Sequence, residues 1–459
     1  ANWIPDLFMK RVIEKGDWTL FSPDQVPNLI NTYGHDFEAE YVKYEALAKE
    51  GKIMSKTVEA SHLWRKMLSM LYETGHPWMT FKCPVNLRNP QGHVGDIHSS
   101  NLCTEITLNT GPSEIAVCNL GSVNLLNHLV RDGKGEFSID QERLNRTVKT
   151  AMRMLENVID INFYPTDKTQ KSNSSHRPVG LGVQGLADVF FMLNLSYESK
   201  EAAEINKKIF ETIYFGAIEA SVEMAKEKGT YSSYEGSPLS NGKFQFDLWN
   251  VQPSGLWDWE GLKVKVKKYG VRNSLTTACM PTASTGIILG NTETFQIQTS
   301  NIYKRQTLSG EFLLVNRFLV NELSQRGLWN KEMRDKIILE NGSVENINEI
   351  PGELKDIYKT VWEVSQKTVI DMAADRAPFI DQTQSMNLWL STPTFGKVNS
   401  MHMYAWKKGL KTGMYYLRSR SAVDAVKVTV SSEKATKEAF INTAINQNNE
   451  PEDCETCSA

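Results

Sequence analysis

Long apolar runs are missing from this sequence. No hydrophobic stretch reaches the roughly 18–20 residues that a membrane-spanning helix needs. The N-terminal stretch ANWIPDLFMKRVIEKGDW also has no apolar centre like that of a secretory signal peptide. We therefore expect no membrane partner and a cytoplasmic protein.

An excess of basic residues is missing too. Lysine and arginine number 51 against 54 aspartates and glutamates, so the net charge is −3. Nucleic-acid binding needs a basic patch or stripe, and we therefore expect no nucleic-acid partner. A hydrophobic content of 41% is ordinary for a globular protein, and 459 residues allow two or three domains or one large α/β barrel.

Cysteine is scarce, with six in the whole chain. That is too few for a disulfide scaffold in a chain of this length. In a reducing compartment cysteines are free thiols, metal ligands or redox catalysts, and an isolated one is by default an inert core residue. The six are Cys83, Cys103, Cys118, Cys279, Cys454 and Cys457.

Helical and strand-like segments alternate along the chain. Apolar residues at helical spacing predict helices over residues 56–74, 140–162, 199–229 and 352–375. The stretch RPVGLGVQGLADVFFML, 177–193, predicts a short strand that runs through glycines into a helix, and proline and glycine predict turn and loop over 80–98. This alternation favours an α/β fold with a mainly parallel sheet.

The last residues differ in composition. Residues 431–459 are polar, contain almost no large apolar side chains and end in a Cys454-x-x-Cys457 pair. We expect a mobile tail. Half of a zinc site and plain surface thiols are alternatives, but no second Cys/His pair with ligand spacing stands nearby. An exposed dithiol on a tether suits disulfide exchange.

The stretch SSNLCTEI, 99–106, places an amide, a thiol and a carboxylate at alternate positions. In an extended chain Asn101, Cys103 and Glu105 would share one face, and a tight loop is the alternative. Such a short pattern has many chance matches, so it assigns no chemistry by itself.

Three further motifs are ambiguous in isolation. The hydroxyl-rich segment MPTASTG, 280–286, fits an anion cradle at the start of a helix, although an ordinary N-cap fits the local pattern better. Adjacent Tyr415 and Tyr416 are ordinary strand composition, because neighbours in a strand point to opposite faces. Cys118, in AVCNLGSVNLL, is by default a buried structural cysteine.

Taken together and in order, these segments closely resemble the large, catalytic subunit of class I ribonucleotide reductase, in its eukaryotic and T-even-phage form. The resemblance runs from near the first residue to about 430, with the tail as a further match. It implies the second half of a ten-stranded α/β barrel with a cysteine-bearing finger loop over 1–430, followed by a flexible redox tail over 431–459. The matching segments include SNLCTEI, AVCNLGSVNL, RPVGLGVQGLADVF, MPTASTGIILGN, TSNIYKRQTLSGEF, FIDQTQSMN and SMHMYAWKKGLKTGMYYLRSR.

The resemblance also implies roles in making deoxyribonucleotides for DNA replication. Cys103 would become a transient thiyl radical that takes the ribose 3′ hydrogen. Glu105 would be the general base on the 3′-hydroxyl, and Asn101 would hold substrate hydroxyls. Cys118 would be one thiol of the pair that is oxidised to a disulfide while the 2′-hydroxyl leaves as water.

Other residues would carry the radical, the substrate and the reducing electrons. Tyr415 and Tyr416 would pass the radical inward from the small subunit. Cys454 and Cys457 would reduce the active-site disulfide again. The residues that would bind the phosphates of a ribonucleoside diphosphate are Pro281, Thr282, Ala283, Ser284 and Thr285.

The implied partners lie outside this chain. No cofactor is expected in it, because the radical comes from the metal centre of the small subunit and the reductant is thioredoxin or glutaredoxin. The family's first half-barrel and the thiol partner of Cys118 are not recognisable here, and Cys83 and Cys279 stand in contexts that do not match that partner. A half-barrel leaves sheet edges exposed and is a poor independent fold. We therefore expect a separate chain to supply the N-terminal half, whether the gene is naturally split or was deliberately cut.

Two other functions remain as alternatives. A relative with its own glycyl radical would need an Arg-Gly-Tyr-like site, which the tail lacks. A non-catalytic remnant acting as a scaffold would be expected to have lost some of the chemical residues, whereas the thiols, the carboxylate and both tyrosines are present.

Overall fold

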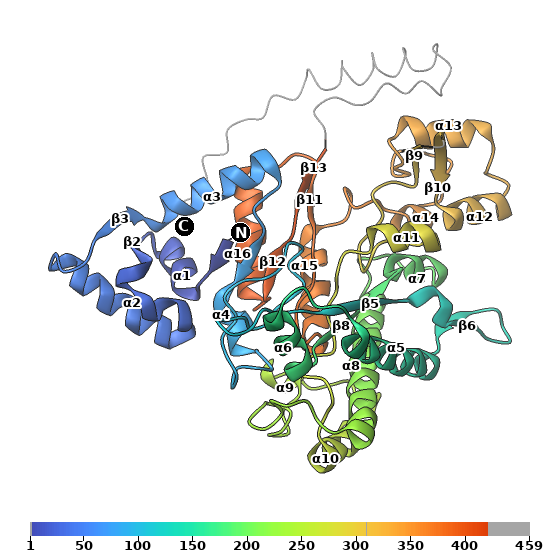
Figure 1. Ribbon diagram of the computed structural model, residues 1–459. Helices are drawn as coiled ribbons and strands as arrows, with labels where there is room; N and C mark the ends of the chain where they lie inside the picture. Colours follow the sequence, from blue (N-terminus) through green and yellow to red (C-terminus); the bar gives the residue numbers. More distant parts are fainter. Residues whose placement is uncertain (1, 309, 421–459) are drawn as a thin grey trace. The chain divides into compact units, whose positions relative to one another are not determined.

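The structure, a computed structural model, describes residues 2–308 and 310–420 (Figure 1). These residues form two compact units. The larger, unit 1, contains residues 2–298 and 362–420, and the described part of unit 2 is residues 299–361.

The predicted redox tail, 431–459, lies outside the described residues, and so do Cys454 and Cys457. Within the described part of the chain, none of the helices combines the length and the apolar character that crossing a bilayer requires.

Unit 1 is built from short strands and longer helices. Its strands are β1 (Asn2–Ile4), β2 (Asp17–Phe21), β3 (Ser55–Glu59), β4 (Met79–Phe81), β5 (Asn119–Asn124), β6 (Leu129–Arg131), β7 (Phe137–Ile139), β8 (Val179–Gln184), β11 (Leu388–Leu390), β12 (Thr412–Met414) and β13 (Leu417–Ser419). Its α-helices are α1 (Asp6–Glu14), α2 (Gly34–Lys49), α3 (Ala60–Thr74), α4 (Lys82–Leu87), α5 (Gln141–Ile161), α6 (Asp167–His176), α7 (Leu186–Met192), α8 (Lys200–Lys228), α9 (Gln245–Leu248), α10 (Trp259–Tyr269), α11 (Ala283–Leu289), α15 (Gln366–Arg376) and α16 (Phe395–Lys407). The 3₁₀ turns are η1 (Pro23–Gln25), η2 (Pro27–Asn31), η3 (Leu125–His128) and η4 (Ala377–Phe379).

Unit 2 is a hairpin followed by three short helices. Strands β9 (Ile302–Thr307) and β10 (Gly310–Val315) pair antiparallel. The helices are α12 (Arg317–Gln325), α13 (Lys331–Leu339) and α14 (Gly352–Ile357).

Four parallel segments form the centre of unit 1. β5 pairs with β8 in parallel, and the far side of β8 pairs with residues 275–279 through a parallel bridge between Leu181 and Thr277. A further parallel bridge, between Cys279 and Gln384, adds residues 381–385. This parallel series is the α/β architecture that the alternation of segments predicts.

A second sheet lies on the other side of segment 381–385. β4 is its middle strand, parallel to β1 and antiparallel to β12. The side chains of Thr383 and Thr412 bridge the two groups of strands, with their hydroxyl oxygens 3.0 Å apart. β13, directly after β12 in the chain, pairs in parallel with β11.

Long helices bury the parallel strands. α5 packs along α8, the two run side by side in Figure 1, and α5 also contacts β5 and β8. Its buried residues include Leu144, Val148 and Met152, at the spacing of one helical face. The predicted helices 140–162 and 199–229 are therefore confirmed as α5 and α8.

The strand-to-helix prediction over 177–193 is also confirmed. It corresponds to β8 and α7, which are joined at Gly185 with a φ of +83°. Few residues other than glycine adopt that left-handed conformation without strain.

Three predicted boundaries are wrong. Residues 56–59 belong to β3, because they pair with β2, so the predicted helix starts only at Ala60. Part of the predicted loop 80–98 is instead β4 and α4, where Pro84 is tolerated in the first turn. The predicted helix 352–375 is two helices, since the chain passes from unit 2 to unit 1 between α14 and α15.

A buried carboxylate ties α5 to the start of the parallel series. Glu156 is fully buried, and its Oε1 accepts from Arg177 Nε at 2.5 Å and from Arg272 Nε at 2.8 Å. Its Oε2 accepts from Asn273 Nδ2 at 2.6 Å. Because a buried charge is tolerated only when it is paired, this carboxylate and its two guanidinium groups depend on one another.

Exchange of Glu156 for glutamine should lower the free energy of unfolding by about 3–5 kcal/mol, because Arg272 and Arg177 lose their shared buried counter-charge and Arg177 keeps only the half-exposed Asp160. Chemical denaturation of the variant and of the parent protein measures the difference in the free energy of unfolding. Glu227→Gln is the matched control, since it breaks an ion pair with Arg153 that lies at the surface, and its effect should be small. Equal losses for the two variants would contradict the assignment.

His402 is buried without a polar partner. It lies on α16 with no exposed surface, and both ring nitrogens lack a hydrogen bond within the described part of the chain. Trp64 packs edge-on against its ring, with centroids 6.1 Å apart. Burial lowers the pKa of His402 to about 4.

This pKa predicts an acid-sensitive fold. Between about pH 6.5 and pH 4 the unfolded chain binds a proton that the folded chain excludes, so stability falls as the pH falls, by up to ~3 kcal/mol from this group. His402→Leu should flatten the pH dependence of the unfolding midpoint in that window. His62→Leu, at an exposed position of α3, is the control and should leave the dependence as it is.

Candidate active site

The stretch around Cys103 is a tight turn, not a strand. Thr104 has a φ of +71°, and the chain folds back so that Asn101 Oδ1 accepts from the backbone N–H of Ile106 at 3.3 Å. The hydroxyl of Ser100 donates to the carbonyl of Ile106 at 2.6 Å. The tight-loop alternative is therefore correct, and alternation along a strand does not explain how the three side chains gather.

Hydrogen bonds bring the amide and the carboxylate together. Asn101 Nδ2 donates to Glu105 Oε1 at 2.8 Å, and the hydroxyl of Ser385 lies 3.0 Å from Glu105 Oε2. The same hydroxyl also faces the carbonyl oxygen of Cys103. Glu105 is 2% exposed, so its carboxylate is fixed in place by these contacts.

Two strand segments hold this finger loop, residues 101–107, between them. On one side the N–H of Thr383 donates to the carbonyl of Glu105 at 3.1 Å. On the other side the hydroxyl of Thr412 donates to the carbonyl of Thr104 at 3.1 Å. The hydroxyl of Thr383 also donates to the hydroxyl of Thr412, so the two segments that hold the finger loop are themselves hydrogen-bonded.

Cys103 and the two tyrosines form a continuous contact. The sulfur of Cys103 lies 3.3 Å from the hydroxyl oxygen of Tyr415. The rings of Tyr415 and Tyr416 have centroids 4.2 Å apart and are tilted by 56°. The expectation that neighbouring tyrosines point to opposite faces is wrong here, because the chain bends at Tyr415 between β12 and β13.

The outer tyrosine is packed on both sides. The ring of His76 lies 3.9 Å from that of Tyr416, and the guanidinium of Arg418 lies 4.1 Å above it. Gly75, which ends α3, accepts from the N–H of Leu417 at 3.2 Å. A Cβ at Gly75 would lie 2.7 Å from the carbonyl oxygen of Leu417, so the end of α3 fits against β13 only with glycine there.

Burial keeps the proton on this thiol and on its phenol partner. It raises the pKa of Cys103 and also that of Tyr415. At neutral pH the pair is therefore an S–H group against an O–H group, the protonation state in which a hydrogen atom can be exchanged between sulfur and oxygen.

Cys118 is connected to the finger loop through one glutamine. Gln382 Nε2 donates to Cys118 Sγ at 3.2 Å and to the carbonyl of Val179 at 3.3 Å. Gln382 Oε1 accepts from the N–H of Thr107 at 3.1 Å. Burial raises the pKa of Cys118 to about 12, against the lowering effect of the Gln382 hydrogen bond.

The glycines of β8 make room for these side chains. A Cβ at Gly180 would lie 3.3 Å from the sulfur of Cys118, and one at Gly182 would lie 2.6 Å from the carbonyl oxygen of Ala278. Glycine at these positions lets Cys118 and Met280 lie directly over the strand. The sequence motif RPVGLGVQG therefore has a packing reason.

The hydroxyl-rich segment opens α11, as its pattern predicts. Thr282 stands at the N-cap position, but its hydroxyl accepts from the N–H of Thr294 at 2.8 Å and not from the helix. The first-turn N–H groups of α11 have no intrahelical acceptor, as in any helix. Ser284 and Thr285 are exposed at this turn, directly after the segment that pairs with β8.

The remaining described cysteines are engaged elsewhere. The sulfur of Cys83 accepts from the N–H groups of Asp6 at 3.3 Å and Gly34 at 3.1 Å. Cys279 is buried in the segment whose backbone pairs with Gln384. All four cysteines among the described residues are free thiols. The same residues contain no group of three or more His, Cys, Asp or Glu side chains that could hold a metal ion.

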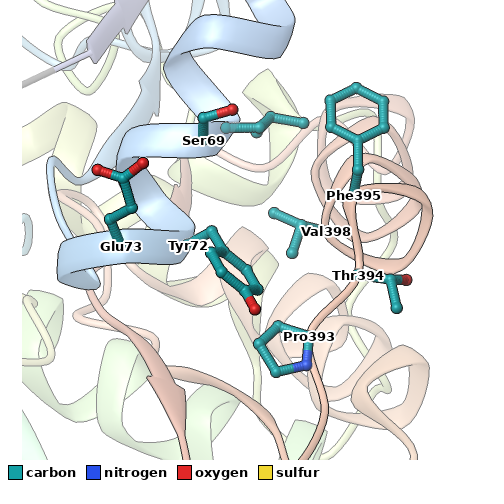
Figure 2. Close-up of a pocket in the computed structure, with 8 residues that line it drawn as sticks. Ser69, Tyr72, Glu73, Pro393, Thr394, Phe395 and Val398 are labelled. Carbon is teal, nitrogen blue, oxygen red and sulfur yellow. The ribbon is translucent and has the colours of Figure 1, made fainter.

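A hollow of about 360 Å³ lies between α3 and the start of α16 (Figure 2). In Figure 2 the side chain of Tyr72, on α3, extends toward Val398 and Pro393, which lie on the α16 side of the hollow. None of the predicted site residues lines it.

Sequence reasoning missed the residues that hold the site together. Gln382, Thr383, Ser385, Thr412 and His76 received no role, although the first three lie in the segment FIDQTQSMN that carries part of the resemblance. Nothing local distinguishes them, because their partners lie far away in the sequence.

Comparisons with known proteins agree with this architecture. Residues 1–416 match the family described as "Ribonucleotide reductase, barrel domain", and the chain belongs to that family. The large chain of ribonucleoside-diphosphate reductase from Schizosaccharomyces pombe is 53% identical over 430 residues, which cover 94% of this chain and 52% of that relative. Large chain 2 from Saccharomyces cerevisiae is 51% identical over 441 residues, or 96% of this chain and 50% of the relative.

A solved structure is similar as well. The Actinobacillus ureae class Id ribonucleotide reductase alpha subunit superposes with a TM-score of 0.64 at 29% identity, over 79% of this chain and 62% of that one. The chain spans about half the length of the curated relatives named above. Its match to the barrel domain confirms the predicted family and fold class.

Gly182→Ala should lower the free energy of unfolding by about 1–3 kcal/mol, because its Cβ would overlap the backbone oxygen of Ala278 and the strands would have to separate. Thermal or urea unfolding measures the loss. Gly121→Ala on the paired strand β5 is the control, since its Cβ would make an ordinary contact of 3.4 Å with Leu155. A Gly182 variant as stable as the Gly121 variant would contradict the close approach.

Proposed function

We propose that this chain is the catalytic part of a ribonucleoside-diphosphate reductase large subunit, which converts ribonucleotides to 2′-deoxyribonucleotides by thiyl-radical chemistry. The observation that carries the proposal is the contact of 3.3 Å between Cys103 Sγ and Tyr415 Oη, beside the hydrogen-bonded Asn101–Glu105 pair. The thiol thus has a radical donor on one side and a base on the other.

The radical would enter through the tyrosines. A small subunit with a metal centre would generate it, and Tyr416 would pass it to Tyr415. Tyr415 would then take the hydrogen atom from the Cys103 thiol, which leaves a thiyl radical. The support for this order is geometric, since the ring contact and the sulfur–oxygen contact follow one another directly.

The substrate would lie against the finger loop. The Cys103 thiyl would take the 3′ hydrogen of the ribose, Glu105 would accept the proton of the 3′-hydroxyl, and Asn101 would hold the hydroxyl groups. The diphosphate would lie at the start of α11, where the exposed hydroxyl groups and backbone N–H groups are compatible with an anion. The phosphate-binding residues in this proposal are Pro281, Thr282, Ala283, Ser284 and Thr285.

Two thiols would supply the electrons. Their oxidation to a disulfide releases two electrons and two protons, and the electrons reduce the 2′ carbon while its hydroxyl group leaves as water. Cys118 would be one of these thiols. We propose that a separate chain with the N-terminal part of the subunit provides the other. The sulfurs of Cys83 and Cys103 already contact the N–H of Asp6 and the hydroxyl of Tyr415, respectively. Cys279 stands in a sequence context that does not match the partner thiol.

A dithiol reductant would complete the cycle. In this proposal residues 1–430 form the catalytic domain and 431–459 a redox tail, whose Cys454 and Cys457 reduce the active-site disulfide by thiol–disulfide exchange. Thioredoxin or glutaredoxin would then reduce the tail. Such chemistry suits the reducing cytoplasm.

Cys103→Ser should abolish ribonucleotide reduction, because a serine O–H bond is too strong to give up its hydrogen atom to a tyrosyl radical. The assay follows deoxyribonucleotide formation in an assembly of this chain with the rest of the large subunit, the small subunit and a dithiol. Tyr415→Phe should abolish it too, since phenylalanine has no O–H group. Cys83→Ser is the matched control and should keep its activity, because a serine oxygen can still accept from Asp6 and Gly34.

Two results would overturn the proposal. Turnover by the Cys103→Ser assembly would exclude a thiyl mechanism. Nucleotide binding without any turnover by the complete parent assembly would favour a scaffold of the same family. Full activity of this chain without the rest of the large subunit would contradict only the separate N-terminal chain.

A further inference from the structure

We propose that Gln382 is a positioning residue, which orients the sulfur of Cys118 and couples it to the finger loop. The inference rests on the proposed function, because it treats Cys118 as one of the thiols that are oxidised. It adds a residue for which neither the sequence patterns nor the chemistry above require a role.

The side chain of Gln382 contacts three separate parts of unit 1. Its amide bonds to Thr107 in the finger loop, to Val179 at the start of β8 and to Cys118 just before β5. Gln382 has no exposed surface, so water does not compete for these bonds. The amide oxygen thus accepts one hydrogen bond and the amide nitrogen donates two.

The partners fix which end of the amide faces the sulfur. The backbone N–H of Thr107 can only donate, so it requires the amide oxygen of Gln382. The carbonyl of Val179 can only accept, so it requires the amide nitrogen. A flipped amide would place donor against donor and acceptor against acceptor, and the NH₂ group of Gln382 therefore points at Cys118.

This orientation makes the Cys118 sulfur an acceptor. A donated N–H favours the thiolate over the thiol, whereas burial and the negative charge of Glu105 both favour the thiol. When Cys118 gives up its proton to form a disulfide, or leaves as a thiolate when that disulfide is reduced, Gln382 would stabilise the negative sulfur.

The Gln382 amide would also couple the position of the finger loop to that of the Cys118 segment. Thr107 is two residues from Glu105 and four from Cys103, and its N–H is held by Gln382. The backbone N–H of Gln382 already donates to the carbonyl of Thr277, so strand pairing does not require this side chain. Its three bonds instead serve the relative position of the two thiol-bearing segments.

Site-resolved alkylation tests the proposal on the full chain. Iodoacetamide labelling of Cys118 and Cys103, read by mass spectrometry over an alkaline pH series, reports the thiolate fraction of each. Gln382→Met keeps the size of the side chain but removes its donor, and should slow Cys118 labelling by roughly threefold to tenfold at a given pH. Gln382→Glu should slow it further, because a carboxylate then faces the thiolate.

Labelling of Cys103 separates the two bonds of the amide. Gln382→Glu still offers an oxygen to the N–H of Thr107, so Cys103 labelling should stay at the parent rate. Gln382→Met offers none, so the finger loop should loosen and Cys103 labelling should rise. Gln245→Met is the matched control: this glutamine is also buried and bonds to the carbonyl of Arg88, and its loss should change neither rate.

Several results would overturn the inference. Equal rates of Cys118 labelling in the parent and both Gln382 variants would exclude the donor role. Faster Cys118 labelling in the Gln382→Glu variant than in the Gln382→Met variant would contradict the expected effect of the carboxylate on the thiolate. If Gln382→Met melts well below the parent, Gln382→Glu decides the question alone. Because alkylation needs no partner and no turnover, failure here leaves the Cys103-dependent assay standing, and failure of that assay leaves these rates interpretable.

Discussion

The position of the Cys103 sulfur depends on how one tight turn is clamped. Residues 101–107 have no regular secondary structure, and the backbone of Thr383 and the hydroxyl of Thr412 hold the loop from two sides. The two sides belong to different groups of strands, one parallel and one mixed. The barrel thus works as a frame that fixes an irregular loop, which is how rigid scaffolds generally present chemical groups.

The distribution of thiols follows from that frame. Burial keeps the protons on Cys103 and Cys118, while the contacts of the two sulfurs differ: a phenol faces one and a carboxamide the other. A phenol can exchange a hydrogen atom, and a carboxamide can only stabilise charge. In the proposed function, cysteine would therefore perform one-electron chemistry at Cys103 and two-electron chemistry at Cys118.

Local patterns predicted the long elements well and the site poorly. The spacing of apolar residues located α5 and α8, because helix burial repeats every few residues. Strand alternation left open whether the finger loop is a strand or a tight turn, and it misjudged the tyrosine pair. Both segments bend sharply, the finger loop at Thr104 and the tyrosine pair at Tyr415. The roles of Gln382 and Ser385 could not be predicted for a different reason, because their partners Cys118 and Glu105 lie 264 and 280 positions away in the sequence. The resemblance to a known family supplied what local physics could not.

The contact between Gly75 and Leu417 has a consequence for how this sequence can vary over evolutionary time. Gly75 carries no reactive group, yet its backbone touches the residue that follows the tyrosine pair, with no space for a single methyl group. A substitution there would push β13 away and change the spacing of the two aromatic rings. Gly75, which has no reactive group, should therefore tolerate substitution as poorly as Cys103 does.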